Sequence, residues 1–212
     1  MENKKLIYTI GHSNHDLSTF LALLKSHNID SVVDVRSVPF SKYTPHFNQD
    51  QLIKSLKEEN IHYIPMGDQL GARWDELYLY NDNNRLDFSK VRQTEKFKTG
   101  INRLLSGLKE GYNISLMCTE KNPSDCHRTI LIAYSLSKME IKINHILADG
   151  KIKEHQQLEK ELIESHFGEI DQLDLFSENN GIKDRLEKLE TAYQKKEEEI
   201  AYQIQQEAIN IG

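Results

Sequence analysis

The sequence predicts an α/β fold: an open, mostly parallel five-stranded sheet with helices on both faces. Strand and helix patterns alternate five times, the strands are short and nearly continuously apolar, and polar residues follow directly after several of them. Alternation of this kind requires crossover connections, which place helices over both faces of a sheet. We expect this domain to span residues 1–165, followed by a linker over 166–181 and a long amphipathic helix over 182–212.

Five apolar runs mark the strands of the predicted sheet. They are Leu6–Ile10, Asp30–Arg36, Ile61–Met66, the run that ends at Cys118, and Ile141–Leu147. The helix after the fourth strand is expected to hold Cys126, His127 and Arg128 in its first turn, capped by Ser124 or Asp125. Residues 67–92 lack periodicity but are rich in aromatic side chains, which favours an ordered lid or binding loop.

Composition limits the classes of function. The chain is 38 % hydrophobic with a mean hydropathy of −0.63, and no apolar run is long enough to span a membrane. We therefore expect a cytoplasmic protein without membrane contact, in which the two cysteines are reactive, metal-binding or simply buried.

The net charge of −6 comes from the tail. Residues 166–212 hold five Lys and Arg against eleven Asp and Glu, which leaves 22 of each in residues 1–165. Neither part is basic enough to indicate nucleic-acid binding by charge alone.

Polar residues follow three of the predicted strands. His12 and Ser13 come after the first strand, Asp34 and Arg36 end the second, and Cys118 and Glu120 follow the fourth. Because ligands bind beyond the carboxyl ends of parallel strands, we expect one shared site at this edge.

Cys126 beside His127 and Arg128 has the surroundings of a low-pKa nucleophile, although a small buried residue would fit the same pattern. His12 is a candidate acid–base group, and Asp34 and Glu120 are candidates to orient it or to act as acid and base.

Arg36 and Arg128 are candidate anion ligands, because guanidinium groups present a planar fork to phosphate or carboxylate. Ser13 and His127 would complete the anion pocket. The alternative is an internal salt bridge of these arginines with Asp34 or Glu120.

Two further features leave alternatives open. Cys118, Cys126, His127 and His12 are a possible zinc set, although the eight-residue gap between the cysteines fits no standard finger spacing. Four aromatic residues could stack on a base or pack a loop onto the domain: Tyr43, Phe47, Trp74 and Tyr78.

The ordered motifs of residues 6–165 resemble the domain-of-unknown-function family numbered 488. The motifs are Thr9–Ser13, Asp34–Arg36 with Pro39 and Ser41, Phe47–Asn48, Leu70–Gly71, Met117–Glu120, Cys126–Arg128 and His145–Ile146. The resemblance implies an α/β domain with this site and leaves its chemistry open. A looser likeness to rhodanese-type domains is an analogy only.

The pentapeptide Gln172-Leu173-Asp174-Leu175-Phe176 is similar to the short motif by which bacterial replication and repair proteins dock on the sliding clamp. The alternative is that its apolar side chains fasten the linker to the domain. The following helix, with an apolar stripe from Ile182 to Ile211, either forms a homodimer or packs back on the domain.

Two functions fit these features. The first is an enzyme, a hydrolase or transferase, that acts on a phosphorylated or nucleic-acid-linked substrate through a Cys/His/Arg anion pocket. The second is a non-catalytic adaptor that senses an anion or a nucleic-acid end and is recruited to the sliding clamp.

Overall fold

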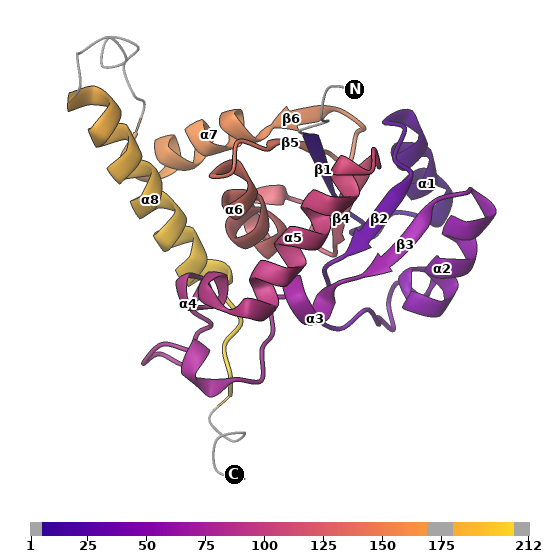
Figure 1. Cartoon of the computed structure of the whole chain (residues 1–212), viewed down its shortest axis with the longest axis horizontal. Helices are drawn as coiled ribbons and strands as arrows, with labels where there is room; N and C mark the ends of the chain where they lie inside the picture. Colours follow the sequence, from indigo (N-terminus) through magenta and orange to yellow (C-terminus); the bar gives the residue numbers. More distant parts are fainter. Residues whose placement is uncertain (1–5, 169–179, 206–212) are drawn as a thin grey trace.

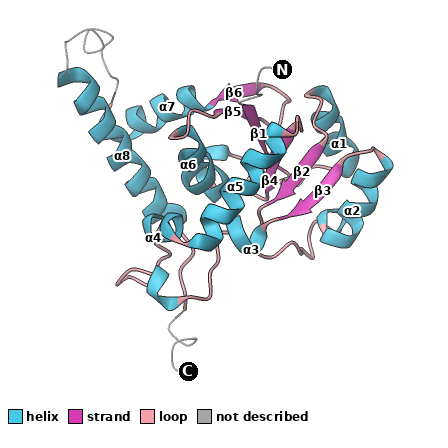
Figure 2. Ribbon diagram, in the orientation of Figure 1, coloured by secondary structure: helices cyan, strands magenta, loops and turns pink. Residues whose placement is uncertain are grey.

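A computed structural model describes residues 6–168 and 180–205 and contains a six-stranded sheet, whose strands Figures 1 and 2 label. Its strands are β1 (Leu6–Gly11), β2 (Ser31–Asp34), β3 (His62–Pro65), β4 (Ile114–Cys118), β5 (Lys142–Ile146) and β6 (Ile152–Glu154). The strand order is β3-β2-β4-β1-β5-β6, and every neighbouring pair is parallel except β5 and β6.

This topology confirms the predicted α/β class and adds one strand. The added strand is β6, a short edge strand that directly precedes α7 (His155–Phe167). A three-residue edge strand leaves too little sequence pattern to be recognised beside a helix.

Helices cover both faces of the sheet (Figure 1). On one face, α1 (Leu17–Ser26) and α2 (Gln49–Glu58) bury apolar side chains against strand residues such as Val32 and Met117. On the other face the larger core includes α3 (Gly67–Leu70), α4 (Phe88–Gln93), α5 (Glu95–Lys109), α6 (Tyr134–Ser137) and α7.

The aromatic segment 67–92 belongs largely to this second core. Trp74, Tyr80 and Phe88 are buried in it, and the Tyr80 hydroxyl donates to the Trp74 carbonyl at 2.7 Å. Only part of the segment, including Tyr78, is exposed. Packing therefore explains Trp74, whereas Tyr78 remains available to a ligand.

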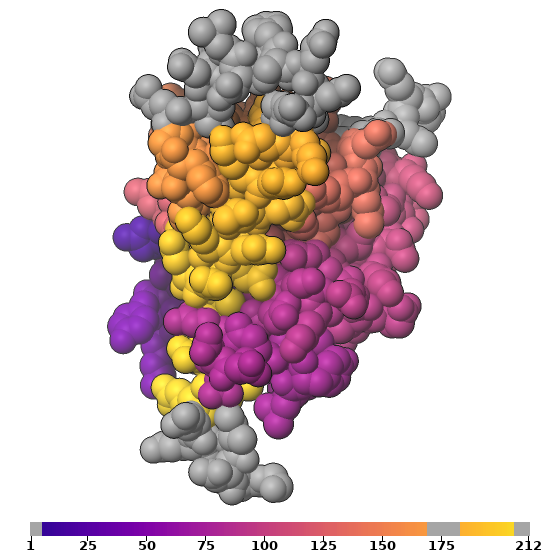
Figure 3. Space-filling view, turned by 90° about the vertical axis from the view of Figure 1, so that its left-hand side faces the viewer, coloured from indigo at the N-terminus to yellow at the C-terminus, as the bar shows by residue number. Residues whose placement is uncertain are grey.

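The C-terminal helix α8 (Asn180–Ile200) packs back on the domain, beside α7 and above the segment 67–92 (Figure 3). Leu189, Ala192 and Tyr193 are buried in the core. The prediction of one helix to Ile211 is too long: residues 201–205 are non-helical and run beside Asn84–Leu86, where the Leu86 amide donates to the Tyr202 carbonyl at 2.9 Å.

Among the described residues, no helix has the length and apolar character needed to cross a bilayer. The proposed clamp-docking peptide Gln172–Phe176 lies outside the described residues.

Candidate metal centre

The two cysteines meet at the carboxyl edge of the sheet, where β4 ends. Cys118 is the last residue of β4, and Gly11 at the end of β1 is its partner in the parallel register. The His12 amide donates to the Cys118 carbonyl at 2.9 Å, so the turn after β1 continues along the same edge. The predicted convergence of these strand ends is present in the structure.

Cys126 lies just before the helix rather than in its first turn. Its backbone is extended, and its carbonyl accepts hydrogen bonds from the Thr129 and Ile130 amides at 2.9 and 3.1 Å. The prediction that Ser124 or Asp125 caps this helix is wrong, because both belong to a preceding 3₁₀ turn, Pro123–Asp125. The helix itself opens as a π-type stretch, Arg128–Ala133, a geometry frequent at functional sites.

Four side chains converge beside Cys126. One ligand atom from each of Cys118, Glu120, Cys126 and His127 lies within 4.8 Å of the others. Glu120 Oε2 is 2.9 Å from both sulfur atoms, and His127 Nδ1 is 3.7 and 3.8 Å from them. Both cysteines are free thiols. The cluster is geometrically able to hold a metal ion.

Surrounding groups fix the orientation of these side chains. His127 Nε2 lies 3.0 Å from the Val35 carbonyl and donates to it, which directs Nδ1 at the sulfur atoms. This arrangement is common for metal-ligating histidines. Burial opposes a charge on this ring, but Cys126 and Glu120 outweigh it and raise the pKa of His127. The Arg128 amide also donates to Cys126 Sγ at 3.5 Å.

Electrostatics distinguishes the two thiols. Burial alone raises the pKa of a thiol, but the Cys118 hydrogen bond and the positive charge of Arg128 lower the pKa of Cys126 well below its ordinary value. Burial, together with the hydrogen bond to Cys126, raises the pKa of Cys118. The cluster therefore favours at least one thiolate before any metal binds.

Arg128 is fully buried and has no carboxylate salt bridge among the described residues. Its guanidinium donates to the Glu120 carbonyl at 2.7 Å and weakly to the Lys121 carbonyl at 3.4 Å, while Nε has no partner. Since an uncompensated buried charge is costly, its counter-charge has to come from the thiolate cluster beside it. The predicted salt bridge with Glu120 is replaced by a bond to that residue's backbone.

Arg36 and Asp34 form a closed pair. The Arg36 guanidinium binds both Asp34 carboxylate oxygens, with the shortest contact 2.6 Å, and donates to the Phe47 carbonyl at 2.9 Å. Tyr63 donates to the same carboxylate at 2.7 Å. The internal salt bridge considered as the alternative for Arg36 is the arrangement observed.

His12 joins this pair rather than the metal cluster. Its Nδ1 lies 2.9 Å from the Ser13 carbonyl and its Nε2 is 3.2 Å from the Arg36 guanidinium, while its ring stacks on Phe47. Burial and the Arg36 charge lower its pKa to about 4. In the set proposed for zinc, the fourth ligand atom thus comes from Glu120, because His12 is turned toward Arg36.

The remaining predicted residues are scattered around these two groups. Ser13 is half-buried. Its amide donates a hydrogen bond to the Thr119 carbonyl at 2.8 Å, and its hydroxyl donates to the Asn14 side chain. Phe47 is buried and Tyr43 is almost fully exposed.

A buried hydrogen-bonded chain escaped the sequence reasoning. It runs from Thr9 through His145 and His155 to Tyr193 and Glu159, with successive distances of 2.8, 3.0, 3.1 and 3.1 Å. The buried histidine in the strand pattern of β5 was a visible signal, but its partners come from β1, α7 and α8, which no local pattern connects. We call these five residues the histidine chain.

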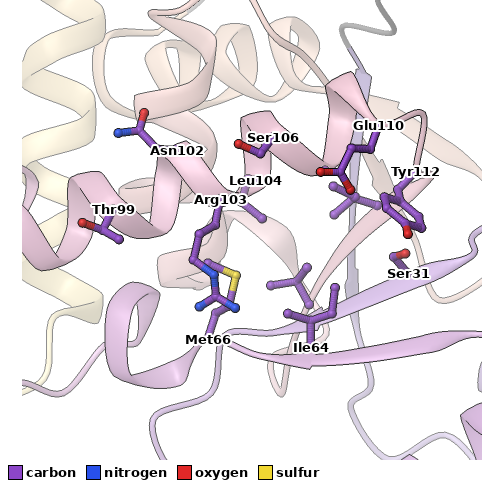
Figure 4. Close-up of a pocket in the computed structure, with 13 residues that line it drawn as sticks. Ser31, Ile64, Met66, Thr99, Asn102, Arg103, Leu104, Ser106, Glu110 and Tyr112 are labelled. Atoms are coloured by element: carbon purple, nitrogen blue, oxygen red, sulfur yellow. The ribbon is translucent and has the colours of Figure 1, made fainter.

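A cavity of about 400 Å³ lies away from the metal cluster, between α5 and the strands β2 and β3 (Figure 4). Ile64 and Met66 line it from one side and Arg103, Ser106 and Glu110 from the other. None of the predicted site residues lines this cavity.

No curated protein and no solved structure matches the chain. A family model described as "Domain of unknown function DUF488" matches residues 16–135, which include the whole metal cluster and the Asp34–Arg36 pair. The match covers more than half of the sequence. The chain therefore belongs to the DUF488 family.

Proposed function

We propose that this protein binds one zinc ion through Cys118, Glu120, Cys126 and His127. Two thiolates, an imidazole and a carboxylate form a set that suits zinc, since soft sulfur ligands disfavour magnesium and calcium. The observation that carries the proposal is the convergence of four ligand atoms within 4.8 Å around a histidine whose second nitrogen is already bonded to a carbonyl.

Charge balance supports the same ligand set. Three negative ligands against the two positive charges of Zn²⁺ leave one negative charge, and the buried Arg128 beside Cys126 cancels it. Without the metal, the buried Arg128 guanidinium has an Nε atom that lacks a hydrogen-bond partner, and no carboxylate among the described residues pairs with it.

Elemental analysis tests the proposal. Wild-type protein purified in the presence of zinc and then desalted is expected to hold one zinc per chain, and Cys118→Ser and Cys126→Ser are expected to hold little. His62→Gln, at the exposed first residue of β3, serves as the control and should retain the metal. A folded wild type that binds no zinc after this treatment contradicts the proposal.

We further propose that the zinc centre serves an enzyme, a hydrolase or transferase acting on a phosphorylated or nucleic-acid-linked substrate. Because Arg36 is engaged by Asp34, the anion pocket first envisaged would depend on the metal and Arg128 rather than on both arginines. A panel of phosphomonoesters, phosphodiesters and nucleotides, compared between zinc-loaded and Cys126→Ser protein, tests this. Turnover that is equal in both would contradict a role for the centre.

The second candidate function is recruitment to the sliding clamp, and the sequence Gln172–Phe176 favours it. This segment connects α7 and α8, which pack against each other. A peptide covering Ile170–Gly181 is expected to bind the purified clamp with micromolar affinity, and alanine at Leu175 and Phe176 should abolish binding by the full chain. If those substitutions lower the melting temperature and no clamp binding occurs, the segment fastens the tail to the domain.

A further inference from the structure

The four candidate ligands do not occupy equivalent positions. In a tetrahedral zinc site, Zn–S and Zn–N bond lengths place a sulfur and a nitrogen ligand about 3.5 Å apart. His127 Nδ1 lies 3.7 and 3.8 Å from the two sulfur atoms, which is close to that spacing. Glu120 Oε2 lies 2.9 Å from each sulfur, about 0.6 Å closer than a tetrahedral site allows.

Entry of a metal ion therefore requires Glu120 to move outward while the other three ligands keep their places. Cys118, Cys126 and His127 are buried, and Glu120 is the exposed member of the cluster. The Val35 carbonyl accepts a hydrogen bond from His127, and the Arg128 amide donates one to Cys126, so both side chains are held in position. Glu120 sits in the loop between β4 and the 3₁₀ turn, with its backbone carbonyl fixed by Arg128 and its side chain directed to the thiols.

We infer that Glu120 is an exchangeable fourth ligand and that the centre takes a small anion in its place. This inference rests on the zinc site proposed above. Catalytic zinc sites use three protein ligands and leave the fourth position open, whereas structural sites are closed. An anion is favoured over a neutral ligand, because replacing one negative charge by another preserves the balance with the buried Arg128.

Cobalt substitution tests the exchange, because the visible absorption of Co²⁺ reports thiolate ligation and coordination number directly. Wild type, Glu120→Ala and the control Glu58→Ala, at an exposed glutamate of α2, are loaded with Co²⁺ and titrated with sodium azide. We expect all three to bind one Co²⁺ with thiolate charge-transfer bands, and Glu120→Ala to bind the metal roughly 10- to 100-fold more weakly than the control, the loss typical for one supporting group.

Azide is expected to change the spectrum of Glu120→Ala at a low concentration. The concentration that changes the spectra of wild type and Glu58→Ala should be at least tenfold higher. In the variant azide enters an open position, whereas in the other two proteins it competes with the carboxylate.

The two proposals fail in different ways. A wild type that takes up neither zinc nor cobalt overturns the zinc site and the exchange with it. If wild type binds metal but Glu120→Ala loses it as completely as Cys126→Ser, the exchange alone is overturned. The same conclusion follows if wild type binds metal and azide leaves all the spectra unaltered. The site would then be a closed, structural one.

Discussion

Two groups of buried polar residues lie in this domain, and their hydrogen bonds differ in kind. In the histidine chain each group donates a hydrogen bond to the next, and the Glu159 carboxylate at its end only accepts. Thr9 donates to His145 Nδ1, His145 Nε2 donates to His155 Nδ1, His155 Nε2 donates to the Tyr193 hydroxyl, and Tyr193 donates to Glu159. This assignment requires both histidines to be neutral and leaves no member without a partner.

The metal cluster has no such alternation. Both thiols converge on one carboxylate oxygen of Glu120 at 2.9 Å and lie 3.7 and 3.8 Å from His127 Nδ1, and all four side chains are of types that ligate zinc. Hydrogen-bonded partners such as those of the histidine chain stabilise a fold without any ligand. Side chains that converge as possible metal ligands stabilise it mainly once a cation is bound between them. The same residue type, histidine, therefore serves packing in one place and is a candidate metal ligand in the other.

The largest effect expected from this difference is that of zinc removal. At a free zinc concentration 1,000-fold above the dissociation constant, binding stabilises the native state by about 4 kcal/mol. Dialysis against a chelator should lower the melting temperature of wild type markedly, and should leave that of Cys126→Ser almost unchanged. Thermal unfolding followed by circular dichroism measures both. If the chelator changes both melting temperatures equally, a bound metal does not stabilise the cluster, and the cluster does not differ from the histidine chain in this respect.

The next largest effect is the pH dependence of the histidine chain. Burial lowers the pKa of His155 to about 4, and burial together with the charge of His155 lowers the pKa of His145 well below its ordinary value. Between pH 6.5 and 4 the unfolded chain binds more protons than the native one, so stability falls as the pH falls through this range. For His155 alone the loss is about 3 kcal/mol.

Urea unfolding at pH 7, 6 and 5 with chelator present measures this slope. His155→Gln, a neutral replacement, is expected to flatten it, and the exposed His62→Gln is expected to leave it as in wild type. His12, with a pKa lowered to about 4 by burial and Arg36, contributes a slope of its own in all three proteins. If the unfolding free energy of His155→Gln depends on pH as strongly as that of wild type, protonation of His155 does not destabilise the native state.

A third substitution disturbs the metal cluster through the backbone. A side chain at Gly11 would place its Cβ 1.9 Å from the Glu120 carbonyl oxygen and 3.2 Å from Arg128 Nη1. Gly11→Ala should therefore displace the loop after β4, cost about 1–3 kcal/mol of unfolding free energy and weaken zinc binding. Gly107→Ala, on α5 beside the flexible end of Ile114, is the matched control and should retain zinc affinity. An unaltered zinc affinity in Gly11→Ala would mean that the loop adapts.

The smallest effect expected is that of Tyr193→Phe. The change removes a hydroxyl that is bonded to His155 and Glu159 at 3.1 Å each, while the ring continues to pack on Tyr134. Loss of these bonds should cost about 1–2 kcal/mol and leave zinc content at one per chain. Denaturant unfolding combined with elemental analysis checks both. A loss of zinc would show that the chain and the cluster are coupled.

The sequence by itself determined the sheet class, the strands β1 to β5 and the edge at which the polar residues gather. Short apolar runs followed by polar turns predict parallel strands, and parallel strands bring their carboxyl ends together whatever the side chains are. The pairing of Gly11 with Cys118 in the register of β1 and β4 agrees with that expectation. Cys118, Cys126 and His127 were for this reason recognisable as possible ligands.

Only the tertiary structure decided which neighbours those residues contact. Glu120 rather than His12 completes the ligand cluster, because Arg36 draws His12 toward Asp34 and the short loop after β4 turns Glu120 back onto both thiols. The same holds for the histidine chain, whose members come from four elements far apart in the sequence, and for α8, whose apolar stripe fits the core of its own domain. Periodicity specifies which face of an element is buried, but side-chain partners depend on distances of a few ångströms that arise only when the layers pack.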